Sequence, residues 1–201
     1  MKISMKKIIN TMAVAAMAVC VLASCGSKAD ENVSGREIHK DGSVTGRIVR
    51  EFDETLYSVD GLKNMMDEEI RSYNFDHAGE HITAGDVSCT EGILTCIMNY
   101  ASAEDYAEFN TRRFVVESFE EAMASDLVKV SVKSVKDMTQ TDLDTLDKTD
   151  DLYVLITDET GQVSFPGKVL YVSDGVESVS NKQINVTDNM DGLAYIVYEN
   201  K

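Results

Sequence analysis

Apolar positions along this chain repeat with two periods, which predict one long helix and a series of strands. From Ser58 to Tyr73 the apolar residues recur mainly at intervals of three and four, which predicts an amphipathic helix with Ser58 as its N-cap. Other stretches alternate apolar and polar residues, as strands with one buried face do. Asp41-Gly42 and Glu91-Gly92 are turn dipeptides, and they predict β-hairpins over residues 37–52 and 82–100.

Two further short helices are predicted by capping residues. Ser102 begins a segment that should carry Tyr106 and Phe109 inward, and Ser118-Phe119-Glu120-Glu121 matches the capping box. The segment Ile93–Met98 is apolar on both faces, which predicts a strand covered on both sides. Further strands are predicted over residues 128–132, 152–157, 162–165, 168–173, 176–179, 184–186 and 193–198.

These elements together predict an α+β fold. We expect an antiparallel sheet with about three helices, mostly in the first half of the mature chain. Residues 138–151 read as an acidic connection between strands. The order of elements shows no internal repeat.

The first 25 residues differ from everything that follows. Lys2, Lys6 and Lys7 precede an apolar run from Met12 to Leu22, which is typical of a secretory signal. This run is well short of the ~20 residues that span a bilayer as a helix.

Leu22-Ala23-Ser24-Cys25 resembles the lipobox of bacterial lipoproteins. The resemblance implies that the Cys25 thiol is acylated and that Cys25 becomes the mature N-terminus. Two or three acyl chains hold a protein firmly, because each buried methylene contributes about 0.8 kcal/mol. We therefore expect a signal peptide over residues 1–24, a flexible tether over 25–35 and one extracytoplasmic domain over 36–201.

The charge narrows the range of partners. The full chain of 201 residues carries a net charge of −16, and removal of residues 1–24 leaves 16 basic against 35 acidic residues, a net charge of −19. Such a surface repels phosphate backbones and anionic head groups, so nucleic acid is not an expected partner. Membrane attachment is expected through Cys25, on the extracytoplasmic face of the cell membrane, and an envelope protein or peptide remains a possible partner.

Two cysteines, Cys89 and Cys96, remain after Cys20 leaves with the signal and Cys25 is acylated. Both lie in one predicted hairpin, on one face and diagonally offset. Export permits a disulfide, but diagonal offsets are often too wide for one. A disulfide and two buried free thiols are the alternatives.

One metal motif occurs in the chain. His77-Ala78-Gly79-Glu80-His81 spells H-x-x-E-H, the zinc signature of inverted zincins, which needs both histidines on one helical face. Gly79 interrupts the segment and a strand is predicted from Ile82, so a solvated loop is the favoured interpretation. Asp76 is a further potential ligand if a metal binds there.

Other chemistry-bearing patterns are missing from the sequence. Residues 142–147 repeat aspartate but lack the glycine and final glutamate of an EF-hand, which favours a solvated acidic loop. We find no nucleophile motif, phosphate-binding loop or dinucleotide fingerprint. No catalytic residue, metal or cofactor is therefore assigned.

Four segments of the mature chain also carry a family resemblance. They are Lys40-Asp41-Gly42, residues 68–74, residues 104–110 and residues 167–174. In this order they resemble small uncharacterised lipoproteins of anaerobic Gram-positive bacteria, which implies an exported, lipid-anchored α+β domain. The leading hypothesis is a non-enzymatic binding or interaction role at the cell envelope. The alternatives are a metal-dependent hydrolase using His77, Glu80 and His81, and a purely structural envelope protein.

Overall fold

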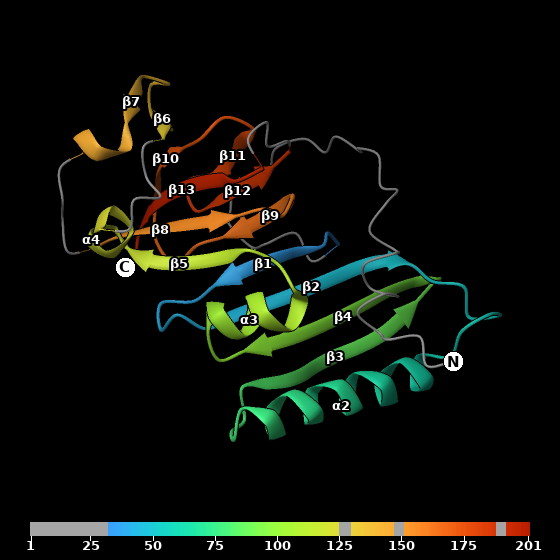
Figure 1. The fold of residues 1–201 in the computed structure, drawn as a ribbon. Helices are drawn as coiled ribbons and strands as arrows, with labels where there is room; N and C mark the ends of the chain where they lie inside the picture. The colour runs from blue at the N-terminus through green and yellow to red at the C-terminus, as the bar shows by residue number, and fades with distance from the viewer. Residues whose placement is uncertain (1–31, 125–129, 147–150, 188–191) are drawn as a thin grey trace.

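Two β-sheets and three α-helices make up the part of the chain that the computed structural model describes, which is residues 32–124, 130–146, 151–187 and 192–201 (Figure 1). The predicted α+β class is confirmed. The expected antiparallel pairing predominates, and the strands divide between a seven-stranded and a six-stranded sheet. The seven-stranded sheet also contains one parallel pair, β1 with β9.

The seven-stranded sheet has the strand order β11-β12-β9-β1-β2-β4-β3. Its members are β1 (Gly35–Ile38), β2 (Val44–Glu51), β3 (Ile82–Thr90), β4 (Ile93–Tyr100), β9 (Gly161–Ser164), β11 (Val176–Ser180) and β12 (Gln183–Val186). The six-stranded sheet has the order β5-β8-β13-β10-β6-β7. Its members are β5 (Phe114–Ser118), β6 (Ser131–Ser134), β7 (Gln140–Asp142), β8 (Leu152–Thr157), β10 (Val169–Val172) and β13 (Ala194–Glu199).

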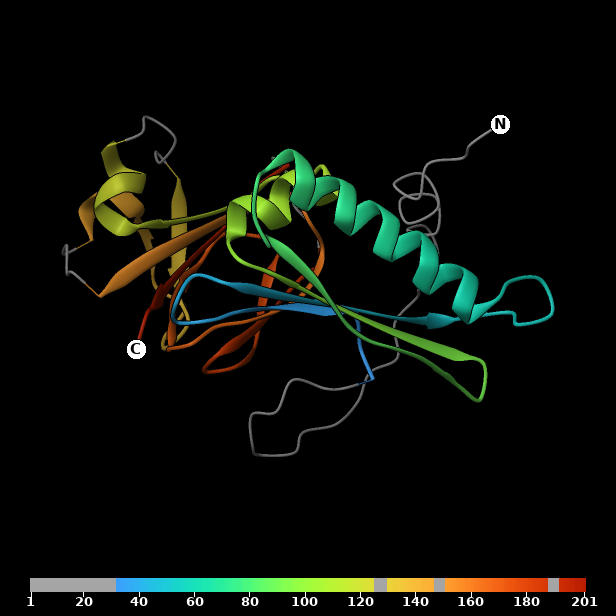
Figure 2. The same ribbon diagram turned by 90° about the horizontal axis from the view of Figure 1, so that it is seen from below.

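The helices are α2 (Val59–Asp76), α3 (Ala103–Asn110) and α4 (Phe119–Ala124), with a 3-10 turn at Leu143–Thr145. Helices α2 and α3 lie on the same side of the seven-stranded sheet (Figure 2). Helix α4 follows β5 directly and packs against β5 and β8.

All three predicted helix starts are confirmed by their caps. The Ser58 hydroxyl accepts a hydrogen bond from the Gly61 amide, and the Ser102 hydroxyl accepts one from the Asp105 amide. At α4 the capping box is complete: the Ser118 hydroxyl accepts from the Glu121 amide, and the Glu121 carboxylate accepts from the Ser118 amide. Each cap satisfies amides that the first helical turn would leave without partners.

Both predicted hairpins are also present. Glu91 and Gly92 have φ of +52° and +76°, as a two-residue type I′ turn requires. The first hairpin has a three-residue loop, since the His39 amide donates to the Ser43 carbonyl and Gly42 has a φ of +86°. Its first strand begins at Gly35, and the Ser34 hydroxyl bonds to the Val49 backbone, so the sheet starts slightly before the predicted domain boundary.

The prediction that residues 93–98 are covered on both faces is wrong. Leu94, Cys96 and Met98 are buried, whereas Ile93 is exposed and Ile97 is half-buried. The reason is that α2 and α3 cover only one side of β4.

Two elements of the six-stranded sheet escaped prediction. Strand β5 falls in a stretch for which no element was predicted, although its Phe-Val-Val run has the β-branched and aromatic residues that strands favour. Strand β7 and the following turn lie inside the predicted acidic connection, because Leu143 is fully buried and holds the segment against the sheet. Of the predicted strand over residues 128–132, Val128 lies outside the described residues.

One hydrophobic core joins both sheets. It contains Ile38 and Val163 from the seven-stranded sheet, Ile196 and Tyr198 from the six-stranded sheet, and Met66 from α2. A second cluster lies on the other face of the six-stranded sheet, under α4 and Leu143. Strands β8 and β13 supply both clusters from alternate residues, which explains their almost unbroken apolar sequences.

No helix among the described residues is long and apolar enough to cross a membrane.

Gly167 is predicted to be indispensable to the packing of the C-terminal strand. A Cβ atom at this position would lie 2.0 Å from the Glu199 carbonyl oxygen, so backbone would have to move. We expect Gly167→Ala to lower the free energy of unfolding by about 2 kcal/mol, as over-packing typically does. Gly61→Ala is the control: its Cβ would meet the nearest atom at 3.6 Å within α2, and alanine should stabilise the helix by about 0.5–1 kcal/mol. Denaturant unfolding measures both, and equal stability of the two variants would contradict the prediction.

Candidate functional site

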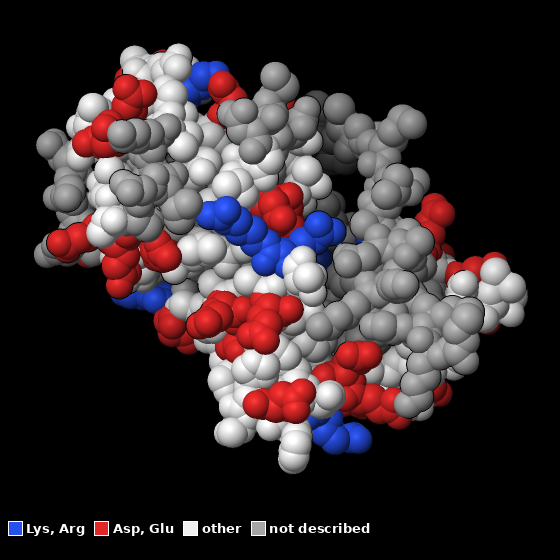
Figure 3. All heavy atoms as spheres, viewed as in Figure 1, with Lys and Arg blue, Asp and Glu red and all other residues white. Residues whose placement is uncertain are grey.

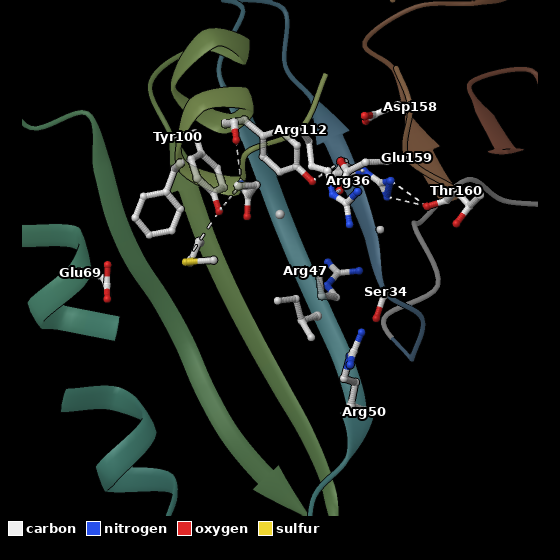
Figure 4. Close-up of a pocket in the computed structure, with 17 residues that line it drawn as sticks. Ser34, Arg36, Arg47, Arg50, Glu69, Tyr100, Arg112, Asp158, Glu159 and Thr160 are labelled. Carbon is white, nitrogen blue, oxygen red and sulfur yellow. Dashed lines mark hydrogen bonds and ion pairs between the residues drawn. The ribbon is translucent and has the colours of Figure 1, made fainter. Parts of the chain in front are cut away.

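A cleft of about 340 Å³ opens beside the middle strands of the seven-stranded sheet. Strands β1 and β2 contribute Arg36, Gly46 and Arg50, and the β8–β9 loop contributes Glu159 and Thr160 (Figure 4). Other lining residues come from β4, α2, α3 and the segment after α3: Met98, Tyr100, Glu69, Tyr106, Phe109, Asn110 and Arg112. Strand pairing sets Arg36 opposite Gly46, and Arg50 lies on the same face of β2.

Arg36 is a deeply buried charged side chain of the cleft, with only 9% of the side chain exposed. Both of its terminal nitrogens donate to the Thr160 carbonyl, at 3.1 and 2.8 Å. Its Nε lies 3.5 Å from a carboxylate oxygen of Glu159. Gly161, with a φ of +107°, follows Thr160 and allows the turn that places this loop beside Arg36.

Glu159 lies between two guanidinium groups and a phenol. Its other carboxylate oxygen is 3.7 Å from Nε of Arg112, while the oxygen that faces Arg36 accepts a 2.7 Å hydrogen bond from the Tyr106 hydroxyl. Burial raises the pKa of the Tyr106 phenol well above its usual value; Arg36 opposes this increase, and Glu159 adds to it. Tyr106 is therefore a proton donor at neutral pH.

Gly46 lets two tyrosine rings close over the sheet. A Cβ atom there would lie 3.3 Å from the Tyr100 ring and 3.5 Å from the Tyr106 ring. These rings meet edge to face at 5.0 Å, and the Asn110 amide donates to the Tyr100 hydroxyl. The result is an aromatic wall next to a charged floor, a combination typical of small-molecule sites.

The distribution of charge singles out this face of the molecule. The chain has six arginines, and four of them, Arg36, Arg47, Arg50 and Arg112, line the cleft. Figure 3 shows basic atoms gathered near the centre of this face, with acidic groups on either side. In a strongly acidic protein, such a cleft focuses a local field that favours anions.

The chemistry available in the cleft is recognition of an oxyanion. Arginine presents a planar fork of N–H donors that matches a carboxylate or phosphate. The lining hydroxyl of Ser34 is engaged with the Val49 backbone, and no histidine or cysteine lines the cleft among the described residues.

Comparisons of the chain with known proteins found no relative. No protein-family model, curated protein or solved structure matches this chain. The resemblance to small lipoproteins therefore stays a prediction.

The H-x-x-E-H segment does not lie on a helix. Helix α2 ends at Asp76, His77 caps it, and Ala78 has a left-handed φ of +53°. The His77 ring contacts the Tyr73 carbonyl at 2.8 Å and the Glu108 carboxylate at 3.3 Å, and Glu80 is exposed. In the described parts of the chain, no group of three His, Cys, Asp or Glu residues is placed to hold a metal ion.

His81 instead belongs to a polar junction around the buried carboxylate of Asp105. One oxygen of Asp105 accepts hydrogen bonds from His81 Nδ1 at 2.9 Å and from the Tyr73 hydroxyl at 3.1 Å. The other oxygen accepts from the Ser102 hydroxyl at 2.6 Å. This junction ties the end of α2, the start of β3 and the cap of α3 together.

The remaining predicted residues have these positions. Cys89 and Cys96 are both free thiols, and Cys96, which is buried, contacts the Met66 sulfur at 3.3 Å. Cys96 pairs with Val87 and Cys89 with Leu94, which is the diagonal offset predicted for them. Cys25 and Asp147 lie outside the described residues.

Sequence reasoning did not find the cleft. Arg36 and Glu159 lie in no motif, and they meet only through the pairing of β1 with β9. The one available signal was composition, because arginines are few and half of them fall within residues 36–50.

His77 is predicted to make stability depend on pH. Its hydrogen bond to the Tyr73 carbonyl raises the pKa of the imidazole; burial opposes this increase, and Glu108 and Asp105 add to it. The folded state therefore binds the proton more tightly than the unfolded state, so this contribution is present below the unfolded pKa of about 6.5 and is lost as pH rises through the folded pKa.

We expect His77→Gln to destabilise the protein more at pH 5.5 than at pH 8.5, as measured by denaturant unfolding. Glu108→Gln, which removes one of the three groups that raise this pKa, should reduce the pH dependence without abolishing it. A loss of stability in His77→Gln that is the same at both pH values would contradict the assignment.

Proposed function

We propose that this protein is a lipid-anchored binding protein of the extracytoplasmic face of the cell membrane, without enzymatic activity. The signal-like segment and Leu22-Ala23-Ser24-Cys25 support the anchor. Once processed at Cys25, the mature chain would carry α2 and α3 in its first half and α4 just beyond its midpoint.

We propose further that the ligand binds in the cleft beside β1 and β2. The main support for a ligand in this cleft is the nearly buried guanidinium of Arg36, in a cavity of about 340 Å³ that also has aromatic lining. This volume is within the usual range for small molecules, and burial of an arginine is unfavourable unless partners compensate it. A small molecule or a short peptide from the cell envelope suits these dimensions.

The lipid anchor predicts a specific mass change. Intact-mass spectrometry of the protein from its own cells should show a diacylglyceryl adduct at the mature N-terminus, and Cys25→Ala should lack it and accumulate unprocessed. Cys89→Ala, which changes a half-buried free thiol, should keep the adduct. The same N-terminal mass in Cys25→Ala and the parent protein would refute lipidation at this residue.

The cleft predicts a bound compound that depends on Gly46. Native mass spectrometry of the full chain, extracted from membranes in mild detergent, should show retained small-molecule mass. Gly46→Val would push side-chain atoms toward the Tyr100 and Tyr106 rings, and the retained mass should fall by about 10-fold. Gly61→Val on the exposed side of α2 is the matched control and should leave the retained mass unchanged. Equal retention in Gly46→Val and the parent protein would exclude the cleft as the site.

A further inference from the structure

Among the described residues, one donor of Arg36 has no hydrogen-bond acceptor. Its Nε is buried, and among the described residues it has no hydrogen-bond partner, although the terminal nitrogens of the same side chain bond to Thr160. Buried N–H groups without acceptors are rare, because each loses its hydration without compensation. The Nε atom is covered, with the Glu159 carboxylate 3.5 Å away, so an acceptor from outside the chain can complete the site only by displacing that carboxylate.

Glu159 indicates which acceptor fits. Its carboxylate lies near Nε of both Arg36 and Arg112, at 3.5 and 3.7 Å, while the Tyr106 hydroxyl makes the short contact of 2.7 Å. A carboxylate is thus already accommodated between two guanidinium groups, at ion-pair distance but beyond hydrogen-bond distance from them. The Glu159 oxygen nearest Arg36 is also the one bonded to Tyr106, so an incoming carboxylate that takes the arginines would displace this oxygen.

The surroundings favour a monoanion with an apolar part. Glu69, Asp158 and Glu159 all line the cleft, and their charge opposes a dianionic phosphate more strongly than a carboxylate. Ile48, Met98 and Phe109 also line it and offer apolar contact beside the arginines.

We propose that the cleft recognises small ligands bearing a carboxylate next to an apolar group, that Arg36 with Arg112 binds the carboxylate, and that Glu159 competes for the same arginines. This inference rests on the proposed binding function and gives it a ligand class. Arg36 is the specific donor because its Nε–H group points in a fixed direction. Attraction between opposite charges alone would not require this geometry.

The test is isothermal titration of the full chain, purified from membranes in detergent, with 3-phenylpropionate. The neutral 3-phenylpropanamide and inorganic phosphate are titrated in parallel. We expect 3-phenylpropionate to bind at least about 10-fold more tightly than the amide or phosphate, since a charge-assisted hydrogen bond is strong in a partly buried site.

Two variants in the cleft should move this affinity in opposite directions. Arg36→Gln should weaken 3-phenylpropionate binding by about 10-fold or more, and Glu159→Gln should strengthen it several-fold because the competing charge is gone. Glu159→Gln retains an oxygen that can accept from Tyr106, so it tests the proposal even if Arg36→Gln is unstable. Arg71→Gln, an exposed arginine on α2 outside the cleft, is the matched control and should change the affinity less than twofold.

Several outcomes would overturn the proposal. Equal affinity for 3-phenylpropionate and 3-phenylpropanamide, or weaker binding of 3-phenylpropionate to Glu159→Gln, would show that the cleft does not recognise the carboxylate. Tighter binding of phosphate would assign a different anion, and binding of no probe to either the parent protein or Glu159→Gln would exclude this ligand class. The proposed binding function is tested separately, by whether the protein retains a bound compound and whether that retention depends on Gly46.

Discussion

The parallel pairing of β1 with β9 is the contact on which the rest of the arrangement depends. It joins Gly35–Glu37 to Gln162–Ser164, segments that are more than 120 residues apart, and makes one seven-stranded sheet out of two antiparallel groups. The entropy of closing so long a loop must be offset by burial, which the adjoining Ile38, Val44 and Val163 supply in the shared core. The same pairing brings Arg36 beside Glu159 and Thr160, so the sheet and the cleft form together.

Burial of Arg36 is difficult to explain by stability alone. Removing a guanidinium from water is unfavourable, and apolar residues of similar volume often stabilise a fold as well as a buried ion pair does. Here the Thr160 carbonyl and Glu159 compensate part of the charge, while one N–H remains without a described acceptor. Incomplete satisfaction of a buried group in a cleft is typical of sites where binding is favoured at some expense of stability.

The six-stranded sheet supplies the rigidity behind this site. Strands β8 and β13 are buried on both faces, between the main core on one side and α4 with Leu143 on the other. The β8–β9 loop leaves this doubly covered sheet and carries Glu159 into the cleft. Its preceding residue, Asp158, is also fixed, because its carboxylate and its amide both bond to the Arg113 backbone. These contacts therefore hold the start of the loop, and with it Glu159, in place beside the cleft.

Local patterns of residues account for most helices, turns and strands of this protein. The caps at Ser58, Ser102 and Ser118, the turn at Glu91-Gly92 and most strands of the second half were predictable, because each depends on residues only a few positions apart. The division into two sheets, the one-sided cover of β4 and the contact of Arg36 with Glu159 could not be predicted in this way. These features follow from contacts between distant segments, whose stability is a sum over the whole buried core that no local pattern of residues records.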